Sequence, residues 1–382
     1  MSLKLKLALV ISLIPLFSLI AQDKPELKIG GAVRFNYNLS SWKEGQQKRG
    51  GDFGYDVFRI NAIAKYKGVK LNTEYRLYSE GFGGGMLKQG WLGYDFTPEN
   101  NLQIGLTQVP FGITQYNSHN WFFSINYYVG LEDDHDMGLK YSHSDEKWDY
   151  ALAFFKNAEE MGFGSNSDVS NSRYSYDVGS SSDGLNRNKE LNQFNGQLIR
   201  KFSTGSVNHK LGVSAEYGGI YNLDTENTGN HYSLAAHYEL VAGKFDLKAQ
   251  VSNYKYNTEN PTGVSNEVIA MTAYGAPYMV ASEGTTYTIG AAYSVPVSWG
   301  PISSLQFYND FGFLDKQVDS FEDSFMNVTG VLISAGNVYT YIDAAYGKDQ
   351  PWLGSVWGDA LSMGSVGSDW EMRFNINIGY YF

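Results

Sequence analysis

The sequence predicts an all-β fold, an antiparallel up-and-down transmembrane β-barrel of 16 strands with long external loops and short periplasmic turns. Three observations lead to this prediction: strict alternation of apolar and polar residues, a rhythm of long loops and short turns, and the composition. The chain of 382 residues has 29 Tyr, 22 Phe, 8 Trp and 42 Gly, and it has 0 Cys. Aromatic residues form the interfacial girdles of such barrels, and a closed hydrogen-bond ladder can hold an exported chain without disulfides.

The stretch 369–382 shows the alternation most clearly. One face is apolar and the other is mostly polar. The apolar face consists of Trp370, Met372, Phe374, Ile376, Ile378, Tyr380 and Phe382. A strand with a period of two fits a barrel wall with lipid on one side and water on the other. In a soluble sheet, a free edge carrying these aromatic residues would promote aggregation.

Earlier strands follow the same rule. Residues 27–39 alternate, a polar loop covers 40–52, and residues 58–66 and 69–77 alternate on either side of the tight turn Lys67-Gly68. A long loop followed by a strand, a short turn and another strand is the order expected when one rim is external and the other periplasmic.

Counting every alternating stretch gives 17 strands, which conflicts with an even number. The segment 266–274 has the poorest alternation, so we exclude it from the barrel and assign 257–284 to one long external loop. The other very long loop is 157–190. The last six predicted strands begin near Phe245, Thr285, Ile302, Phe325, Val338 and Asp369.

The first 21 residues have the layout of a cleaved secretory signal peptide. Lys4 and Lys6 precede an apolar run, and small and polar residues follow it at Ala21 and Gln22. Pro15 and the short run argue against a membrane-spanning helix. We expect residues 22–382 to form a single barrel in the bacterial outer membrane. The net charge of −11 argues against a nucleic-acid partner.

Four arginines fall on lumen-facing positions of the first three strands and the last one, which become neighbours when the barrel closes: Arg34, Arg59, Arg76 and Arg373. They predict a cationic arc at comparable depth, with Lys65 and Lys70 nearer the periplasmic end. A guanidinium stays charged and presents five donors to a carboxylate or phosphate. The alternative is that these charges pair with Glu74 or simply solvate a wet wall.

The segment 108–136 is too aromatic for a solvent-exposed loop and too irregular for a hairpin, so we expect it to fold into the lumen as a constriction. Its acidic end would then face the arginine arc with Glu132, Asp133, Asp134 and Asp136. An external rim turn or a Ca²⁺ site are the alternatives, although the spacing lacks the EF-hand positions. No cofactor is expected.

Several blocks together resemble the phosphate-selective porin family (the O and P porins) and related porins. They are residues 105–112, Trp121-Phe122 and 136–141, and later 308–311, 326–331, Asp343, 347–352 and 373–379. The resemblance implies a trimeric porin with its third external loop folded inward. Phosphate selectivity in that family depends on a lysine-rich vestibule and an arginine ladder, and 108–136 contains no Lys or Arg.

The predicted function is a passive channel for small hydrophilic solutes, with a possible bias toward anions or phosphate. Its expected partners are outer-membrane lipid, the solutes themselves and two further copies of the chain. An outer-membrane lipase or protease is an alternative, for which His143 between Ser142 and Ser144 is the nearest motif. An adhesin or receptor using the loops 157–190 and 257–284 is another.

Overall fold

A computed structural model describes residues 25–159 and 171–382. The predicted signal peptide, residues 1–21, lies outside the described residues. Within the described part of the chain, no helix is long and apolar enough to cross a membrane.

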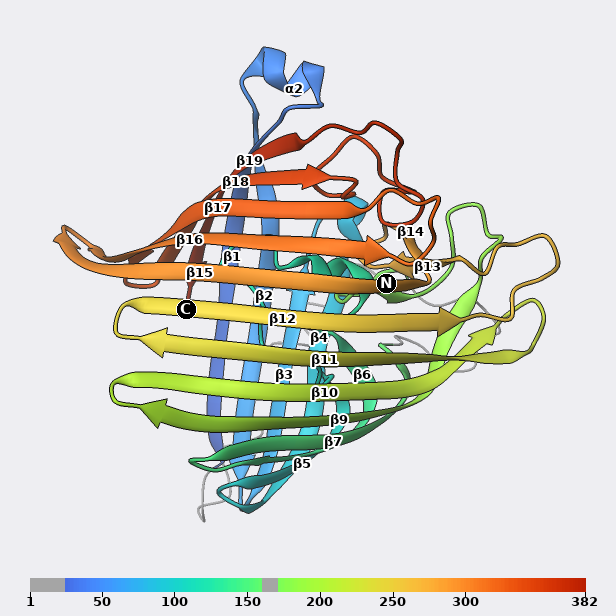
Figure 1. Ribbon diagram of the computed structural model, residues 1–382. Coiled ribbons are helices and arrows are strands. Elements are labelled where there is room, and N and C mark those ends of the chain that lie inside the picture. The colour runs from blue at the N-terminus through green and yellow to red at the C-terminus, as the bar shows by residue number, and fades with distance from the viewer. Residues whose placement is uncertain (1–24, 160–170) are drawn as a thin grey trace, which may run out of the picture.

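The described chain forms a closed antiparallel barrel of 16 strands, which confirms the predicted fold class (Figure 1). Each barrel strand pairs with the next barrel strand along the chain, and β1 closes the ring by pairing with β19. The barrel strands are β1 (Glu26–Ser40), β2 (Asp52–Tyr66), β3 (Val69–Leu77), β4 (Gly85–Thr97), β5 (Asn100–Gln108), β6 (His135–Ser144), β7 (Trp148–Ala158), β9 (Asn188–Thr204), β10 (Val207–Asn222), β11 (Thr228–Ala242), β12 (Phe245–Asn257), β15 (Glu283–Trp299), β16 (Ile302–Lys316), β17 (Ser324–Ala335), β18 (Val338–Lys348) and β19 (Glu371–Tyr381).

The closing seam joins the first and last strands in continuous register. Val33 faces Tyr380 and Asn36 faces Asn377, and beyond β19 the Gly31 amide donates to the Phe382 carbonyl at 2.9 Å. Closure gives both edge strands a partner, so no unpaired backbone row is left in the lipid.

Alternation along the strands separates an apolar exterior from a polar interior. On the outside, Leu152, Leu234 and Ile289 expose 63%, 54% and 52% of their surface. On the inside, neighbouring positions such as Ser233 and Asn377 are buried. A wall with exposed aliphatic side chains outside and buried polar ones inside is suited to lipid, not to water.

Short turns lie at one end of the barrel and long loops at the other (Figure 1). Gly336-Asn337 joins β17 to β18, and Gly336 has φ 59°, a conformation that glycine adopts without strain. At the long-loop end, α2 (Glu44–Arg49) projects beyond the rim, and η2 (Glu80–Phe82) follows β3. The strand parity deduced from the sequence is therefore confirmed.

A second, smaller sheet lies at the long-loop end. It has the order β14-β13-β8 and is built from β8 (Asp177–Val178), β13 (Val268–Thr272) and β14 (Tyr278–Ala281). The segment 266–274 was excluded from the barrel, and β13 indeed takes no part in it. The sequence analysis did not predict that this segment would form a strand elsewhere, because Val268 to Met271 do not alternate. An unbroken apolar run of this kind suits a strand that is buried on both faces.

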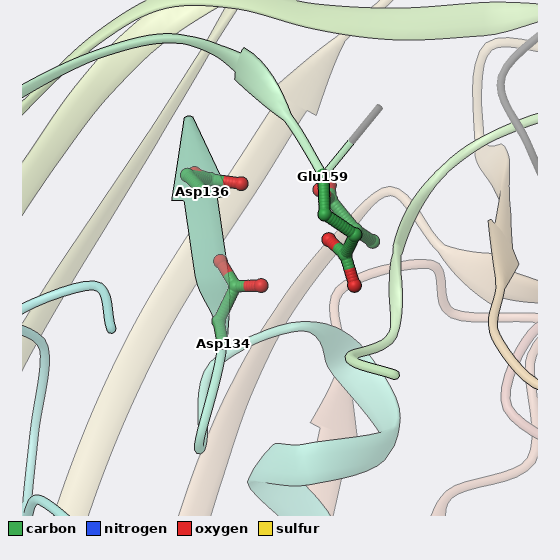
Figure 2. Close-up of side chains that lie close together, drawn as sticks. Asp134, Asp136 and Glu159 are labelled. Carbon is green, nitrogen blue, oxygen red and sulfur yellow. The ribbon is translucent and has the colours of Figure 1, made fainter. Parts of the chain in front are cut away.

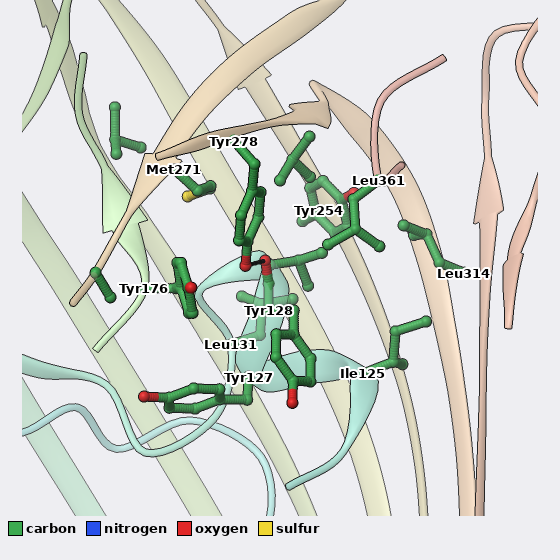
Figure 3. Packing of buried hydrophobic residues seen from close by; sticks show 14 of the residues in the cluster. Ile125, Tyr127, Tyr128, Leu131, Tyr176, Tyr254, Met271, Tyr278, Leu314 and Leu361 are labelled. Atoms are coloured by element: carbon green, nitrogen blue, oxygen red, sulfur yellow. Dashed lines mark hydrogen bonds between the residues drawn. The ribbon is translucent and has the colours of Figure 1, made fainter. Parts of the chain in front are cut away.

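This small sheet packs onto a loop inside the barrel, the inner loop (residues 109–134), which contains η3 (Ile125–Val129). Figure 3 shows Tyr127 and Tyr128 of the inner loop beside Tyr176, Met271 and Tyr278 of the mouth. The Tyr278 hydroxyl donates to the Tyr128 carbonyl at 2.7 Å. Parts of the loops predicted to be external thus fold inward and form an apolar core within the barrel mouth.

Candidate functional site

A cavity of about 590 Å³ lies between the first strands of the barrel and the inner loop. Its lining combines guanidiniums and asparagines of the wall with aromatic rings of the inner loop and the mouth. The charged or strongly polar residues that the barrel strands contribute are Arg34, Asn36, Asn38, Asp52, Asp56, Arg59, Arg76 and Arg373. The structure therefore brings all four arginines singled out in the sequence to one cavity.

Two of these arginines share a carboxylate. Arg59 on β2 and Arg76 on β3 are direct register partners, and both reach Glu74. The N–O distances to Glu74 Oε1 are 3.3 Å from Arg59 and 2.6 Å from Arg76. The Arg76 side chain is also packed against the Tyr174 ring at 4.3 Å. Pairing with Glu74, the alternative raised from the sequence, does occur for these two residues.

The other two arginines differ in their partners. Arg34 Nε lies 2.8 Å from Asp56 Oδ2. Arg373 donates to Asn38 Oδ1 at 2.8 Å and to the Trp352 carbonyl at 3.3 Å, and no described carboxylate forms an ion pair with it. Its register partner is Ser40, six positions along β1 from Arg34, so the two backbones lie at different depths although both side chains line the cavity.

The wall around the cavity is positively charged overall. When the ion-pair partners of the lining residues are included, five guanidiniums (the four of the wall and Arg49) are met by three carboxylates, Asp52, Asp56 and Glu74, which leaves a net charge of 5 − 3 = +2. An Arg side chain remains protonated under all relevant conditions. A cavity with low-dielectric walls and one sign of charge concentrates ions of the opposite sign.

The two lysines that the sequence analysis placed nearer the periplasmic end than the arginines lie at the short-turn end of the barrel. Lys65 and Lys70 are register partners beside the Lys67-Gly68 turn, and Lys70 Nζ is 2.6 Å from Asp95 Oδ2. They line a smaller hollow at the short-turn end of the barrel and do not line the arginine cavity.

Hydrogen bonds anchor the inner loop to the opposite wall of the barrel. The Ile113 amide donates to Gln250 Oε1 on β12 at 2.8 Å, and the His119 amide donates to Asp310 Oδ2 on β16 at 2.9 Å. Asn120 adds two donors to the same Asp310 oxygen, at 3.1 and 2.8 Å. Because the loop is fixed to the far wall, the open space remains on the arginine side.

The His119 ring is held between two carboxylates. Its Nδ1 is 2.8 Å from Asp310 Oδ1 and its Nε2 is 3.1 Å from Asp246 Oδ1. Burial and the nearby Lys248 disfavour the charged ring, but the hydrogen bonds to both aspartates outweigh them and raise the pKa of His119. A protonated imidazolium can donate to both carboxylates at once.

The acidic end of the inner loop lies away from the cavity lining. Glu132 accepts from the amides of Asn117 and Ser124 within the loop, and burial raises its pKa to about 7. Asp133 binds Lys88 at 2.7 Å and accepts from the Tyr174 hydroxyl at 2.7 Å. Asp134 and Asp136 belong to a separate buried cluster. The structure therefore does not bring these four carboxylates opposite the arginines.

The face opposite the arginines is aromatic instead. Phe123 and Tyr127 stack with ring centroids 4.1 Å apart, and Tyr127 shares a 2.7 Å hydrogen bond with Tyr274. Tyr174 and Trp352 come from two other mouth loops. Sequence analysis identified the aromatic residues of the inner loop but missed these partners. The apolar run at 268–271 and the Tyr174–Tyr176 alternation were signals that these loops bury side chains.

The histidine considered as a catalytic residue lies at a short turn. His143 Nδ1 is 2.9 Å from Asn100 Oδ1, and its Nε2 is 3.3 Å from Asp145 Oδ2. The neighbouring Ser144 hydroxyl donates to Asp149 Oδ1 at 2.5 Å. The Ser144 hydroxyl is thus directed to a carboxylate and not to the imidazole that would activate it.

No family model matches the sequence, and no curated protein matches it either. Solved structures of outer-membrane channels do resemble the fold. The outer membrane channel DcaP of Acinetobacter baumannii aligns with a TM-score of 0.59 at 11% identity, covering 94% of this chain and 97% of that one. An anion-selective porin from Comamonas acidovorans gives 0.56 at 13%, covering 94% and 100%. OmpT, an outer membrane protein of Vibrio cholerae solved in trimer form, gives 0.55 at 13%, covering 94% and 100%.

At these identities the likeness establishes the fold alone, which is that of porins. The architecture of the barrel indicates the cellular location of the protein. A closed barrel with an apolar outer wall satisfies its backbone only within itself and exposes aliphatic side chains to its surroundings. Such a wall is stable in lipid, and barrels of this type span the outer membrane of bacteria. The protein is a porin-like barrel of the bacterial outer membrane.

Proposed function

We propose that the protein is a passive channel for small hydrophilic solutes with a preference for anions. The observation that supports this most directly is the cavity lined by four guanidiniums, whose charge exceeds that of the nearby carboxylates. Charged rings and arcs set the selectivity of pores because they attract counter-ions at the narrowest point. Solutes would cross the barrel between this arginine wall and the aromatic face of the inner loop.

Conductance in planar bilayers tests the proposal. The purified protein should produce ohmic steps, and the reversal potential in a KCl gradient should show chloride to be more permeant than potassium. Arg373→Gln should lower the chloride-to-potassium permeability ratio, because Arg373 has no described carboxylate partner and its charge acts undiminished on the cavity.

Arg200→Gln is the matched control. Arg200 lies on β9 beside the Trp148 ring at 4.7 Å and does not line the cavity, so its loss should leave the ratio unchanged. A protein without conductance steps would contradict the channel. An unaltered ratio in Arg373→Gln would contradict the role of the arginines while leaving the channel itself standing.

Phosphate is the solute that distinguishes a general anion preference from the selectivity of the O and P porins. Millimolar phosphate should reduce the chloride conductance if the guanidiniums bind it, since Arg presents a fork of donors that fits phosphate oxygens. Equal chloride conductance with and without phosphate would indicate a preference for anions in general and no specific binding of phosphate.

We further propose a homotrimer, which the trimer form of the Vibrio cholerae protein supports by analogy of fold. Light scattering of the protein in detergent measures the subunit number. We propose no enzymatic activity, because Ser144 is bonded to Asp149 and His143 to Asn100 and Asp145. Hydrolysis of phospholipid or peptide by the pure protein, lost in His143→Ala, would favour the lipase or protease instead.

A further inference from the structure

A cluster of four buried carboxylates lies outside the arginine cavity, where the inner loop meets the barrel wall and the mouth. It draws one residue from each of four places: the end of the inner loop, the start of β6, the segment that follows β7, and the strand β8. The four are Asp134, Asp136, Glu159 and Asp177. Each offers a carboxylate oxygen, and these oxygens all lie within 4.8 Å of one another. Figure 2 shows the Asp134 and Asp136 side chains extending toward Glu159.

Three of the four carboxylates have one oxygen near a donor and a second oxygen with no hydrogen-bond partner. Glu159 Oε1 accepts from the Ser175 amide and hydroxyl, both at 3.0 Å, and Asp177 Oδ1 accepts from the Val178 amide at 2.6 Å. Asp136 Oδ2 is 3.4 Å from Gln193 Nε2. The second oxygens, Asp136 Oδ1, Glu159 Oε2 and Asp177 Oδ2, are buried and have no hydrogen-bond partner. Those three residues are each exposed by no more than 2%.

A buried carboxylate oxygen without a donor is costly, and three of them around one point imply a ligand that contributes positive charge. The protein itself places little positive charge near these oxygens. Arg173 is fully buried nearby, but its Nε and Nη2 donate to the Thr272 and Val178 carbonyls, and its Nη1 approaches Asp177 Oδ2 only to 3.7 Å. Four carboxylates against one guanidinium leave an excess of three negative charges, and Glu190 on β9 also interacts with this group.

We propose that this cluster is a Ca²⁺ site. Ca²⁺ takes six to eight oxygen ligands at about 2.3–2.6 Å, so two of its ligands on opposite sides lie about 5 Å apart, which fits the observed spread of the four oxygens. Mg²⁺ requires near-octahedral geometry at about 2.0–2.1 Å and usually retains water with one or two carboxylates. Four carboxylates from four segments suit the larger, more tolerant ion.

The site would join parts of the molecule that are far apart in the sequence. Asp134 ends the inner loop, and Asp177 belongs to the small sheet that packs over it. A cation bound to both fixes the inner loop at its second end, opposite its anchor on Asp310. Ca²⁺ in the external medium would then stabilise the closed arrangement of the barrel mouth.

Calorimetric titration of the chelator-treated, refolded barrel in detergent with CaCl₂ measures binding directly. We expect one Ca²⁺ per chain and a rise in the unfolding temperature with Ca²⁺ concentration, because a ligand that binds only the folded state stabilises it by mass action. MgCl₂ at the same concentration should bind at least tenfold more weakly.

The double variant Asp136→Asn/Glu159→Gln should lose at least tenfold in Ca²⁺ affinity. Removing two like charges relieves repulsion, so we expect it to fold and to unfold at the same temperature with and without Ca²⁺. Asp343→Asn is the matched control, since Asp343 is an equally buried carboxylate bonded to the Tyr308 hydroxyl at 2.6 Å and outside the cluster. It should bind Ca²⁺ as the natural sequence does.

The titration of the natural sequence needs no variant to be decisive. If Ca²⁺ neither binds nor raises the unfolding temperature of the natural protein, protons shared among the carboxylates satisfy the cluster and the proposal is overturned. Binding that persists in the double variant would place the ion elsewhere and overturn it equally. Neither result depends on whether the barrel conducts anions.

Discussion

At the scale of single residues, the arginine wall depends on which charges are neutralised locally. Arg34 is paired with Asp56 at 2.8 Å, whereas Arg373 is held by the neutral groups of Asn38 and Trp352. The sequence predicted the four arginines from their lumen-facing positions. It did not predict the role of Asp56, because a partner in the next strand depends on register, and β1 and β2 shift register at Arg34.

Asp56→Asn should therefore increase the preference for anions. It removes a negative charge from the wall and leaves Arg34 unpaired. One added unit of positive charge about 6 Å from a passing anion lowers its energy by about 0.7 kcal/mol in water-like surroundings, roughly a threefold change in permeability. The reversal potential in a KCl gradient measures it.

Asp149→Asn serves as the control for this substitution. Asp149 also has a cationic partner, Lys201 at 2.6 Å, but neither residue lines the cavity. A shift of the same size in both variants would show that the overall charge of the barrel, and not the cavity, sets the selectivity.

At the scale of elements, the inner loop is the part that narrows the lumen. Its prediction from sequence rested on the density of aromatic residues, and the structure shows those rings packed with Tyr174, Tyr274 and Trp352 from other loops. The expectation that its carboxylates would face the arginines relied on sequence position alone. Nothing in a single sequence specifies the distant partners of an irregular segment, so Asp310 and Lys88 could not be identified as its anchors.

Asp310→Ala should free the middle of this loop. The amides of His119 and Asn120 and the Asn120 side chain would lose their acceptor, at a cost of about 1–3 kcal/mol for a buried donor left unpaired. We expect a lower unfolding free energy in urea and noisier single-channel currents. Asp315→Ala, on the opposite face of β16, should change neither. Quiet currents in Asp310→Ala would show that other contacts suffice to hold the loop.

The same anchor should depend on pH through His119. Its pKa is raised in the folded protein by Asp310 and Asp246, against the opposing effects of burial and Lys248. A group whose folded pKa is raised contributes stability that is complete below the unfolded value of about 6.5 and is lost as the pH rises through the folded pKa. Urea unfolding between pH 5 and 9 should show this loss in the natural sequence.

The variant His119→Gln isolates that contribution. A glutamine cannot be protonated, so the difference in unfolding free energy between the two proteins should be largest at acidic pH and shrink toward alkaline pH. A difference that is constant over the whole range would show that the imidazole does not titrate where its surroundings predict.

At the scale of the whole molecule, alternation and parity were sufficient to predict the barrel. The period of two is a local property of each strand, and closure requires an even count, so both can be deduced from one sequence. The small sheet β14-β13-β8 was missed because β8 has only two residues and pairs with a strand about 90 positions later. Local patterns do not reveal pairings of that kind.

Leu234→Arg tests the lipid-facing surface of the barrel. Leu234 lies midway along β11 and exposes 54% of its surface on the outer wall. An arginine near the middle of the bilayer should lower the unfolding free energy in lipid vesicles by about 2–4 kcal/mol. Leu234→Ala, which adds no charge, should cost less. Equal effects would place this position outside the hydrocarbon.

The anchors of the inner loop also bear on the order of assembly. His119 binds Asp310, a partner 191 residues further along the chain, and Ile113 binds Gln250 across 137 residues. Neither bond can form until the later strands have been added to the growing wall, and bringing such distant segments together is slow. We therefore expect the passage to narrow late in biogenesis, after the strands that carry Asp310 and Gln250 have joined the wall.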